Sequence, residues 1–289
     1  MTEKDVDVLI PCFNGSSHVR ATLDSVLSQR YDRYNVIVIN DGSTDSTSAI
    51  LDEYGSAITV LSHADMCNHG QAASLNLGLT NSRSKFVAFL DSDDIWHSNK
   101  LCRLVKFLEL NQEVSLVYTN GYVIDSEGRE LYPIYPDDHH EKNEPKDLLI
   151  DCYIRTPSQV MVRREVFRKA GYFKQGIIPA DHDMWLRIKE CANICYLNEF
   201  LIDYRQHPAQ MSSSRSVAMW NDGFHVLADA MKRYNYPANI RRKRLAVLHY
   251  RLGECSLRRN SIFRAIPHFF LACWYDPVRS LKTLNHVMR

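Results

Sequence analysis

The strongest constraint on the fold is an alternation between short apolar runs and helix-like segments in the N-terminal part of the chain. VDVLIP (6–11), NVIVIN (35–40), ITVLS (58–62) and KFVAFLD (85–91) have the length and composition of buried strands. A segment with helical periodicity follows each of these runs. Because strands joined by helical crossovers pair in parallel, the alternation predicts an α/β fold with a mostly parallel, doubly wound sheet.

The pattern changes farther along the chain and suggests how it is divided. Apolar segments on either side of Gly128 predict a hairpin, and from about residue 216 the sequence is helical and basic. We therefore expect one domain over residues 1–215, with halves at 1–112 and 113–215. A basic helical region is expected over 216–289.

The fourth apolar run ends in three carboxylates within four positions, Asp91, Asp93 and Asp94. In open α/β sheets, ligands bind at the carboxyl ends of the strands. Carboxylate oxygens suit Mg²⁺ or Mn²⁺, so the cluster predicts a divalent-cation site. If the backbone stays extended, Asp91 and Asp93 point to one side and Ser92 to the other. The residues also allow a helix cap at Asp94 or Ser98, or a solvated acidic turn.

The second apolar run also ends in polar residues, in the sequence NDGSTDS. Gly42 permits a tight turn, and Ser43 to Asp45 are suited to capping a helix. Asp41 precedes the turn, where its carboxylate could accept hydrogen bonds from a base or a ribose. The chain has no G-x-G-x-x-G after its first strand and no G-x-x-x-x-G-K, which argues against dehydrogenases and P-loop enzymes.

Four motifs in this region carry a family resemblance. LIPCFNG (9–15), VINDGSTD (38–45), NHGQAASLNLGL (68–79) and FVAFLDSDD (86–94) resemble the donor-binding half of family-2 glycosyltransferases. That family has the GT-A fold, an α/β domain that binds nucleotide sugars. The resemblance therefore implies a nucleotide-diphosphate sugar as the donor, most commonly a UDP-sugar.

Three later motifs follow in the order that the family has them. PSQVMVRREVFRKAGYF (157–173) and ADHDMWLRI (180–188) are similar to its acceptor half, and YRQHPAQMS (204–212) to its closing segment. The resemblance extends over about residues 5–212. It implies an acceptor hydroxyl on a glycan or a lipid-linked saccharide.

The resemblance implies roles for individual residues of the donor site. It assigns Asp41 to the base and Asp91 to the ribose, and Pro11 and Phe13 to the slot in which the base lies. Ser92, between the two strand-end carboxylates, is also expected in the nucleotide-sugar site.

For the diphosphate, the resemblance implies that Asp93 holds Mn²⁺ or Mg²⁺ and that His207 closes on the diphosphate or the metal. Arg205 is expected to contact the diphosphate, although a plain surface charge is an open alternative. Asp181 is the expected base, which deprotonates the acceptor hydroxyl. Ala180 replaces the Glu that usually precedes this Asp, and Leu75 stands where many members have Arg.

These roles imply a hexosyltransferase-type enzyme that inverts configuration in a single displacement. Two alternatives from other classes remain open. One is a sugar-nucleotide or glycan-binding module without activity. The other is a metal-dependent phosphatase or phosphotransferase, whose Asp-x-Asp motif continues with Gly-Thr near the N-terminus, whereas Asp94 and Ile95 follow here.

The remaining sequence features bear on location. The start MTEKDVDVLIP is acidic and does not resemble a signal peptide, and eight scattered cysteines indicate a reducing cytoplasm. Residues 232–289 contain 13 Lys and Arg against two acids. Within them, apolar residues recur at helical spacing: Ile262, Ile266, Phe269, Phe270, Cys273 and Trp274.

This basic region has two open interpretations. It could form a helical hairpin that packs against the acidic catalytic part of the chain. It could also make a peripheral contact with the anionic inner face of a membrane. Charge alone would suit nucleic acid, but no other feature supports such a partner, and we expect none.

Overall fold

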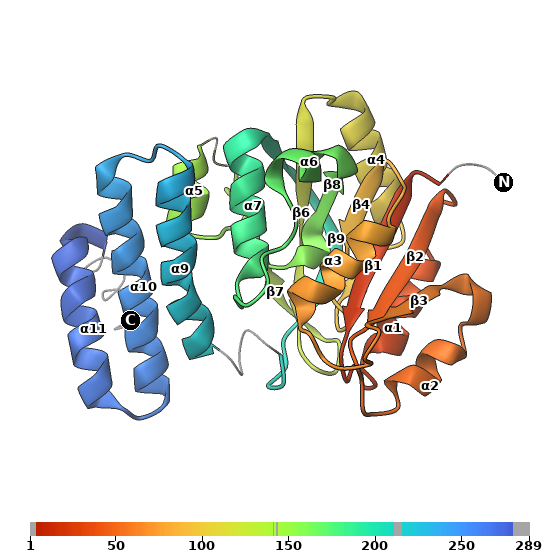
Figure 1. Ribbon diagram of the computed structural model, residues 1–289, viewed down its shortest axis with the longest axis horizontal. Coiled ribbons are helices and arrows are strands. Elements are labelled where there is room, and N and C mark those ends of the chain that lie inside the picture. The colour runs from red at the N-terminus through yellow and green to blue at the C-terminus, as the bar shows by residue number, and fades with distance from the viewer. Residues whose placement is uncertain (1–3, 141, 143, 211–215, 280–289) are drawn as a thin grey trace. The chain divides into compact units, whose positions relative to one another are not determined.

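The computed structural model describes residues 4–140, 142, 144–210 and 216–279 (Figure 1). The chain divides into two compact units. The first comprises Met1–Glu141, Ile154–Gln175 and Arg187–His207, and the second comprises Lys142–Tyr153, Gly176–Leu186 and Pro208–Arg289. Two segments that precede residue 215 thus belong to the second unit, and the expected division at that residue stays a prediction.

The first unit is built around one nine-stranded sheet in the order β3-β2-β1-β4-β8-β6-β9-β5, with β7 beside β6. The strands are β1 (Val6–Cys12), β2 (Tyr34–Asn40), β3 (Thr59–Ser62), β4 (Phe86–Phe89), β5 (Ile95–Trp96), β6 (Val114–Ile124), β7 (Glu130–Pro133), β8 (Val160–Arg163) and β9 (Asn193–Arg205). The strands from β1 to β4 pair in parallel, as the alternation predicted. Beyond β4 the pairing is mixed, since β8 runs antiparallel to both β4 and β6, whereas β9 is parallel to β6.

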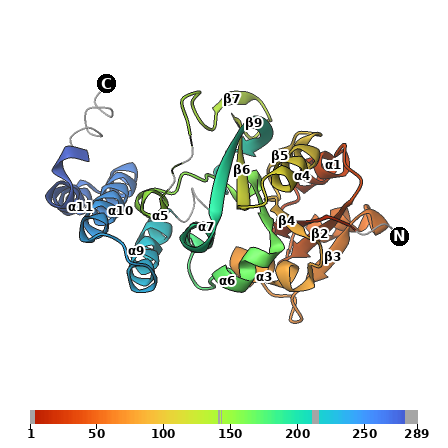
Figure 2. The same ribbon diagram turned by 90° about the horizontal axis from the view of Figure 1, so that it is seen from above.

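Helices cover both faces of this sheet. They are α1 (Val19–Leu27), α2 (Thr47–Asp52), α3 (Gln71–Asn81), α4 (Lys100–Leu110) and α6 (Phe167–Ala170). Figure 2 shows α1 and α4 on one side of the sheet and α3 and α6 on the other. Alternate residues of β1, such as Val8, join Leu23 of α1 and Leu104 of α4 in one core cluster. Double coverage explains why the strands are continuous apolar runs.

On the other face, α3 lies very close to the sheet. A Cβ atom at Gly78 would be 3.1 Å from the side chain of Leu9 and 3.0 Å from that of Ile39. Glycine therefore lets the helix backbone approach β1 and β2. This contact holds α3 against β1 and β2.

The strand register brings the polar strand ends together. Cys12 pairs with Asn40, and Leu9 pairs with Phe89, so the residues after β1, β2 and β4 emerge at the same edge of the sheet. Chain segments that are far apart in sequence thus meet where open α/β sheets bind ligands.

The helix cap considered at Asp94 or Ser98 is not formed. His18 occupies the cap position of α1 and makes no capping bond, while the backbone N–H of Ser16 donates to Asp45. Helix α4 begins after Asn99, not at Asp94 or Ser98. Polar loop residues here join loops to one another, which propensity alone does not predict.

The second unit consists of helices. They are α5 (Pro145–Ile150), the start of α7 (Ala180–Cys191), α9 (Ser216–Arg233), α10 (Ala238–Arg258) and α11 (Ile262–Tyr275). Figure 1 shows α9, α10 and α11 side by side, so the expected helical C-terminal extension is present. Asp183 has a residue type that suits a helix cap, but α7 begins at Ala180 and Asp183 lies inside its first turn. None of the described helices is long and apolar enough to cross a membrane.

Candidate active site

Two loops lie side by side at the edge of the sheet where β1 and β2 end. The backbone N–H of Asn14 donates to Ser43 Oγ (3.0 Å), and the N–H of Thr44 donates to Asn14 Oδ1 (2.8 Å). These bonds tie the loop after β1 to the loop after β2. Phe13 lies in the first loop with 46 % of its surface exposed, while Pro11 lies within β1 opposite Ile39. The exposed ring is available for stacking, and a base slot at Pro11 and Phe13 stays a prediction.

Asp45 strengthens the same junction. Its carboxylate accepts hydrogen bonds from the backbone N–H groups of Ser16 (3.1 Å) and Thr47 (3.0 Å). Burial raises the pKa of Asp45, but hydrogen bonds from the side chains of Ser16 and Thr47, together with those from their backbones, favour the ionised form more strongly and lower its pKa to about 2. The loop junction is therefore held by an ionised carboxylate.

Asp41 is buried at the end of β2 and holds a third loop. Its Oδ1 accepts from the N–H of His69 and its Oδ2 from the N–H of Gly70, both at 2.8 Å. Gly70 has a φ of +86°, a conformation that favours glycine, immediately before α3. The carboxylate thus anchors the loop that leads into α3, and its expected contact with a base remains a prediction.

Asp91 follows β4 and is surrounded by hydrogen-bond donors. Its Oδ1 accepts from Gln71 Nε2 (2.9 Å) and its Oδ2 from Thr156 Oγ1 (3.0 Å). Ser158 Oγ also accepts from the backbone N–H of Asp91 (2.9 Å). The side chain is therefore oriented by α3 on one side and by the segment before β8 on the other.

The backbone at this point is not extended. The N–H of Asp94 donates to the carbonyl of Asp91 (3.2 Å), so the chain turns at Ser92 and Asp93. The extended geometry considered from the sequence, with Asp91 and Asp93 on one side and Ser92 on the other, is therefore wrong. The turn separates the carboxylates and gives each of them different partners.

Asp94 is the buried member of the cluster. Its Oδ1 accepts from the backbone N–H of Arg205 (2.9 Å), and its Oδ2 lies 3.1 Å from Thr156 Oγ1. Burial, followed by the charges of Asp93 and Asp91, raises its pKa well above the ordinary value. The protonated form that this favours reduces the repulsion among three adjacent acids.

Asp93 meets His207 at the outer side of the turn. His207 Nε2 lies 2.9 Å from Asp93 Oδ2, and the ring centroid of His18 lies 5.1 Å from that of His207. Burial lowers the pKa of His18, and the positive charges of Arg205 and His207 lower it further. The two residues expected to act as metal ligands are thus brought together.

The spacing of this pair fits a divalent cation. Two neighbouring ligands of an octahedral ion, each at 2.0–2.1 Å from it, lie about 3 Å apart. The 2.9 Å between His207 Nε2 and Asp93 Oδ2 matches that separation. In the part of the chain that the structure describes, no group of three or more His, Cys, Asp or Glu side chains is arranged to hold a metal. A bound ion would therefore take its other ligands from the substrate and water.

Arg205 ties the segment before His207 to the turn. Its Nε donates to the carbonyl of Asp93 (2.9 Å), and its Nη1 to the carbonyls of Asp125 and Ser126 (both 3.1 Å). With its backbone bond to Asp94, Arg205 positions the turn and His207 together. Its expected contact with a diphosphate remains a prediction, and the structure gives it this positioning role.

Asp181 lies in the second unit, in the first turn of α7. The backbone N–H of His182 donates to its Oδ1 (2.7 Å), and burial raises the pKa of Asp181 above its ordinary value. His182 Nε2 lies 2.8 Å from the carbonyl oxygen of Leu148, which holds the start of the helix against α5. The role of Asp181 toward the donor site stays a prediction.

Four residues that orient the site had no role assigned from the sequence. Gln71, Thr156 and Ser158 hold Asp91, and His18 lies beside His207. Gln71, Thr156 and Ser158 could have been suspected from the sequence, because they lie in or directly before the motifs NHGQ and PSQ. Their shared partner, Asp91, could not be predicted from these motifs, since α3 and the segment before β8 meet only in the folded chain.

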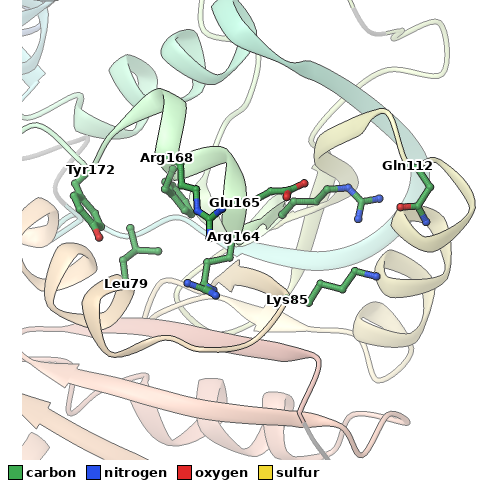
Figure 3. Close-up of a pocket in the computed structure, with 9 residues that line it drawn as sticks. Leu79, Lys85, Gln112, Arg164, Glu165, Arg168 and Tyr172 are labelled. Carbon is green, nitrogen blue, oxygen red and sulfur yellow. The ribbon is translucent and has the colours of Figure 1, made fainter.

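A separate hollow lies at the opposite end of β4. It has a volume of about 600 Å³ and is lined by basic and aromatic residues that include Lys85, Arg164, Arg168 and Tyr172 (Figure 3). Lys85 directly precedes β4, whereas Asp91 follows it. The lining includes none of the residues predicted for the donor site, so the hollow is distinct from it.

Comparisons with known proteins identify the family. The model of the family described as glycosyl transferase family 2 matches residues 7–171, more than half of the chain. The chain belongs to glycosyl transferase family 2.

Proteins of similar sequence are also named as glycosyltransferases. An uncharacterized glycosyltransferase of Rickettsia prowazekii, RP339, is 30 % identical over 219 residues, which cover 72 % of this chain and 66 % of that protein. A putative teichuronic acid biosynthesis glycosyltransferase of Bacillus subtilis, TuaG, is 28 % identical over 218 residues, 73 % of this chain and 82 % of that protein. Some relatives are much longer, and the match covers 34 % of one from Rickettsia bellii.

Solved structures confirm the expected GT-A fold. S. aureus TarS 1–349 in complex with UDP-GlcNAc aligns with a TM-score of 0.71 at 17 % identity, over 96 % of this chain and 82 % of that one. The mannosyltransferase PcManGT of Pyrobaculum calidifontis, solved with GDP-Man and Mn²⁺, aligns with a TM-score of 0.65 at 15 % identity. The alignment covers 100 % of this chain and 80 % of that one. At these identities the likeness concerns the fold.

Proposed function

We propose that this family-2 member transfers a hexose from a nucleotide-diphosphate sugar to a hydroxyl group of a glycan or lipid-linked saccharide. The observation that carries the proposal is the pairing of Asp93 with His207 at the edge where Asp91 and Asp41 also lie. Carboxylates and a histidine at the carboxyl ends of parallel strands suit a metal-bound diphosphate.

In this proposal the donor nucleotide lies across the strand ends. Phe13 stacks on the base, Asp41 accepts from it, and Asp91, held by Gln71 and Thr156, accepts from the ribose. The fixed orientation of Asp91 supports this role, because a carboxylate held by two donors loses little freedom when a ligand binds. We propose uridine as the base, and TarS was solved with UDP-GlcNAc.

The diphosphate lies next to the turn that contains Ser92 and Asp93. Asp93 and His207 would hold Mn²⁺ or Mg²⁺, and PcManGT was solved with Mn²⁺. When bound, such an ion neutralises the charge that develops on a departing diphosphate. Arg205 keeps Asp93 and His207 at the spacing that this requires.

Asp181 is proposed as the base for the acceptor. It would take the proton from the acceptor hydroxyl while that oxygen attacks the anomeric carbon opposite the leaving diphosphate, which inverts the configuration in one displacement. A raised pKa makes the carboxylate a stronger proton acceptor than an ordinary Asp. A positioned base typically contributes about 10²–10⁴ to the rate.

Donor binding can be tested by thermal shift against UDP, GDP, dTDP and CDP, each with Mn²⁺. The proposed nucleotide, at 100 times its dissociation constant, should stabilise the fold by about 2.7 kcal/mol. The shift should be smaller without Mn²⁺ and in Asp93→Asn, but unchanged in the exposed control Asp137→Asn. No shift with any nucleotide would contradict the proposal.

A second assay separates an enzyme from a binding module. Release of free nucleotide from a nucleotide sugar in the presence of Mn²⁺ is expected of a transferase, which hydrolyses its donor slowly when no acceptor is present. A binding module without activity would show the thermal shift but no release. The phosphatase alternative is not supported, because the chain belongs to glycosyl transferase family 2.

A further inference from the structure

Helix α11 exposes a continuous apolar face. Phe263 is 87 % exposed, and Phe270 and Trp274 are each 67 % exposed. Ile262 and Ile266 are exposed beside them. The spacing of these residues places them on one side of the helix. We call these five residues the α11 stripe.

The opposite side of α11 is already used for packing within the second unit. Ala265 and Ala272 are buried, and Phe269 packs against Tyr250 of α10. A Cβ atom at Gly253 would lie 2.9 Å from the Phe269 ring, so α10 and α11 approach closely. The α11 stripe therefore faces away from the helix that anchors α11.

Such a surface calls for a partner. Contiguous exposed apolar patches that are rimmed by polar or charged residues often mark sites of interaction with proteins or membranes. Isolated exposed apolar residues need no explanation, but five on one side of a 14-residue helix do.

Most of the charges around the stripe are positive, with Asp276 at the C-cap of α11 as an exception. Arg258 and Arg259 lie exposed just before α11, and Arg264 lies in its first turn. Arg279 follows the helix and pairs with Asp151 (3.4 Å). At the other end, Arg242 of α10 donates to the carbonyl of Trp274 (3.3 Å). Over residues 232–289 the sequence has 13 Lys and Arg against two acids.

We propose that the α11 stripe is a peripheral docking surface for an anionic lipid bilayer. The aromatic and aliphatic side chains would enter the boundary between headgroups and acyl chains, and the surrounding arginines would bind lipid phosphates. The helix would lie in the plane of the interface. At 14 residues it is about 21 Å long, too short to span a hydrocarbon core of about 30 Å. This inference does not depend on the proposed transfer reaction.

A second copy of the chain fits the surface less well. In a two-fold symmetric contact the same patch meets itself, so the arginines around one stripe would face those of the other. One helix about 21 Å long and 10 Å wide also offers much less area than the roughly 800 Å² per partner of a stable interface. An anionic surface removes the repulsion, and a bilayer needs no matching shape.

Nucleic acid would complement the positive charge around α11, but it would not match the apolar side chains of the α11 stripe. Bases stack on aromatic rings, whereas Ile262 and Ile266 offer no ring face and would be placed against phosphates or water. Aliphatic and aromatic residues side by side match the acyl boundary of a bilayer better.

The test is co-sedimentation of the full chain with vesicles of phosphatidylcholine alone or mixed with phosphatidylglycerol. We expect at least tenfold tighter binding to the anionic vesicles at low salt. The preference should largely disappear at 1 M salt, where the screening length falls to about 3 Å. Each arginine near the surface should contribute about fivefold.

Two matched variants separate the stripe from the charge. Phe263→Ser with Phe270→Ser changes exposed side chains and should weaken binding at least tenfold, whereas Leu110→Ser, an exposed apolar residue of the first unit, should not. Replacing Arg258, Arg259 and Arg264 by Gln should remove the preference for anionic lipid. Replacing three exposed cations of the first unit, Arg30, Lys106 and Arg168, by Gln should leave it.

Three results would overturn the proposal. The first is equal recovery on neutral and anionic vesicles. The second is wild-type binding by the Phe263→Ser, Phe270→Ser variant. The third is a different partner for the stripe: a dimer in sedimentation velocity that this variant abolishes, or competition by an oligonucleotide at concentrations below those of the lipid. Nucleotide-dependent thermal shift, measured in parallel on the same variants, should be unchanged and reports on the donor site separately.

Discussion

His207 Nε2 lies 2.9 Å from Asp93 Oδ2, although the two residues are separated by 114 positions in the chain. Arg205 makes this contact possible. It donates from its backbone to Asp94 and from its side chain to the carbonyl of Asp93, so the segment after β9 is fixed to the turn after β4. The contacts of Arg205 therefore position Asp93 and His207 relative to each other.

The first prediction concerns this pair. His207→Ala should raise the Mn²⁺ concentration needed for half-maximal donor turnover by at least tenfold, because it removes one of the two proposed protein ligands. His97→Ala is a matched control, since His97 pairs with Asp203 elsewhere in the first unit. An unchanged Mn²⁺ requirement in His207→Ala would exclude His207 as a ligand.

The second prediction concerns the proposed base. Asp181→Asn keeps the shape of the side chain and removes its ability to accept a proton, so kcat should fall by about 10² or more while donor affinity is retained. Initial rates with a competent acceptor measure this. If kcat remains within a factor of three of wild type, the base is another residue, and Asp183 in the same turn is the next to test.

The third prediction concerns the pH dependence of turnover. A base acts only when it is deprotonated, and burial raises the pKa of Asp181 above 3.8. We expect kcat to fall as the pH decreases through this raised pKa, so the acid limb of the profile should lie above pH 3.8. The residual activity of Asp181→Asn should lack that limb. A limb that persists in the variant would belong to a different group.

The fourth prediction concerns stability at low pH. Burial, with the charge of Arg244, lowers the pKa of His182 from 6.5 to about 3. Between these values the unfolded chain binds a proton that the folded chain does not. The free energy of unfolding should therefore fall as the pH drops below 6.5, by up to about 1.4 kcal/mol per pH unit from this group.

Urea denaturation at several pH values between 7.5 and 4.5 measures this fourth prediction. His182→Gln keeps an amide that can donate to the carbonyl of Leu148 and does not titrate. The variant should show a shallower loss of stability with acid than wild type. If the free energy of unfolding depends on pH equally in the variant and in wild type, folding does not lower the pKa of His182.

The fifth prediction concerns the residue that bridges two of the clustered carboxylates. Thr156 Oγ1 lies 3.0 Å from Asp91 and 3.1 Å from Asp94. Thr156→Val keeps the volume and removes the hydroxyl, leaving the buried Asp94 with one partner fewer, at a cost of about 1–3 kcal/mol of stability. Donor affinity should fall as well, and Thr156→Ser should restore both. A valine variant as stable as wild type would show that the hydroxyl is dispensable.

Much of the first unit could be predicted from the sequence, because local patterns decide it. The helix-like segment after the third apolar run is α3 (Gln71–Asn81), and the strand expected over NVIVIN is β2 with one more residue. Apolar runs covered on both faces leave little ambiguity, and the turn glycine Gly42, with a φ of +71°, behaves as expected.

The roles of the individual acids could not be predicted in the same way. Asp91, Asp93 and Asp94 look equivalent in the sequence, yet only the third is buried, because Arg205 and Thr156 come from distant segments to meet it. Asp183 had the residue type of a helix cap but lies inside α7, because the helix begins at Ala180. Tertiary contacts decide these cases, and a single sequence does not show them.

In the proposed donor site, Asp93 after β4 holds the metal-bound diphosphate of a sugar donor. The most direct measurement is release of nucleotide from a nucleotide sugar by wild type and Asp93→Ala, with Mn²⁺ or with EDTA, alongside the thermal unfolding of both proteins. We expect turnover only for wild type with Mn²⁺, a loss of at least 100-fold in Asp93→Ala, and similar melting temperatures for the two proteins. Turnover by Asp93→Ala within a few-fold of wild type would exclude Asp93 from the proposed role.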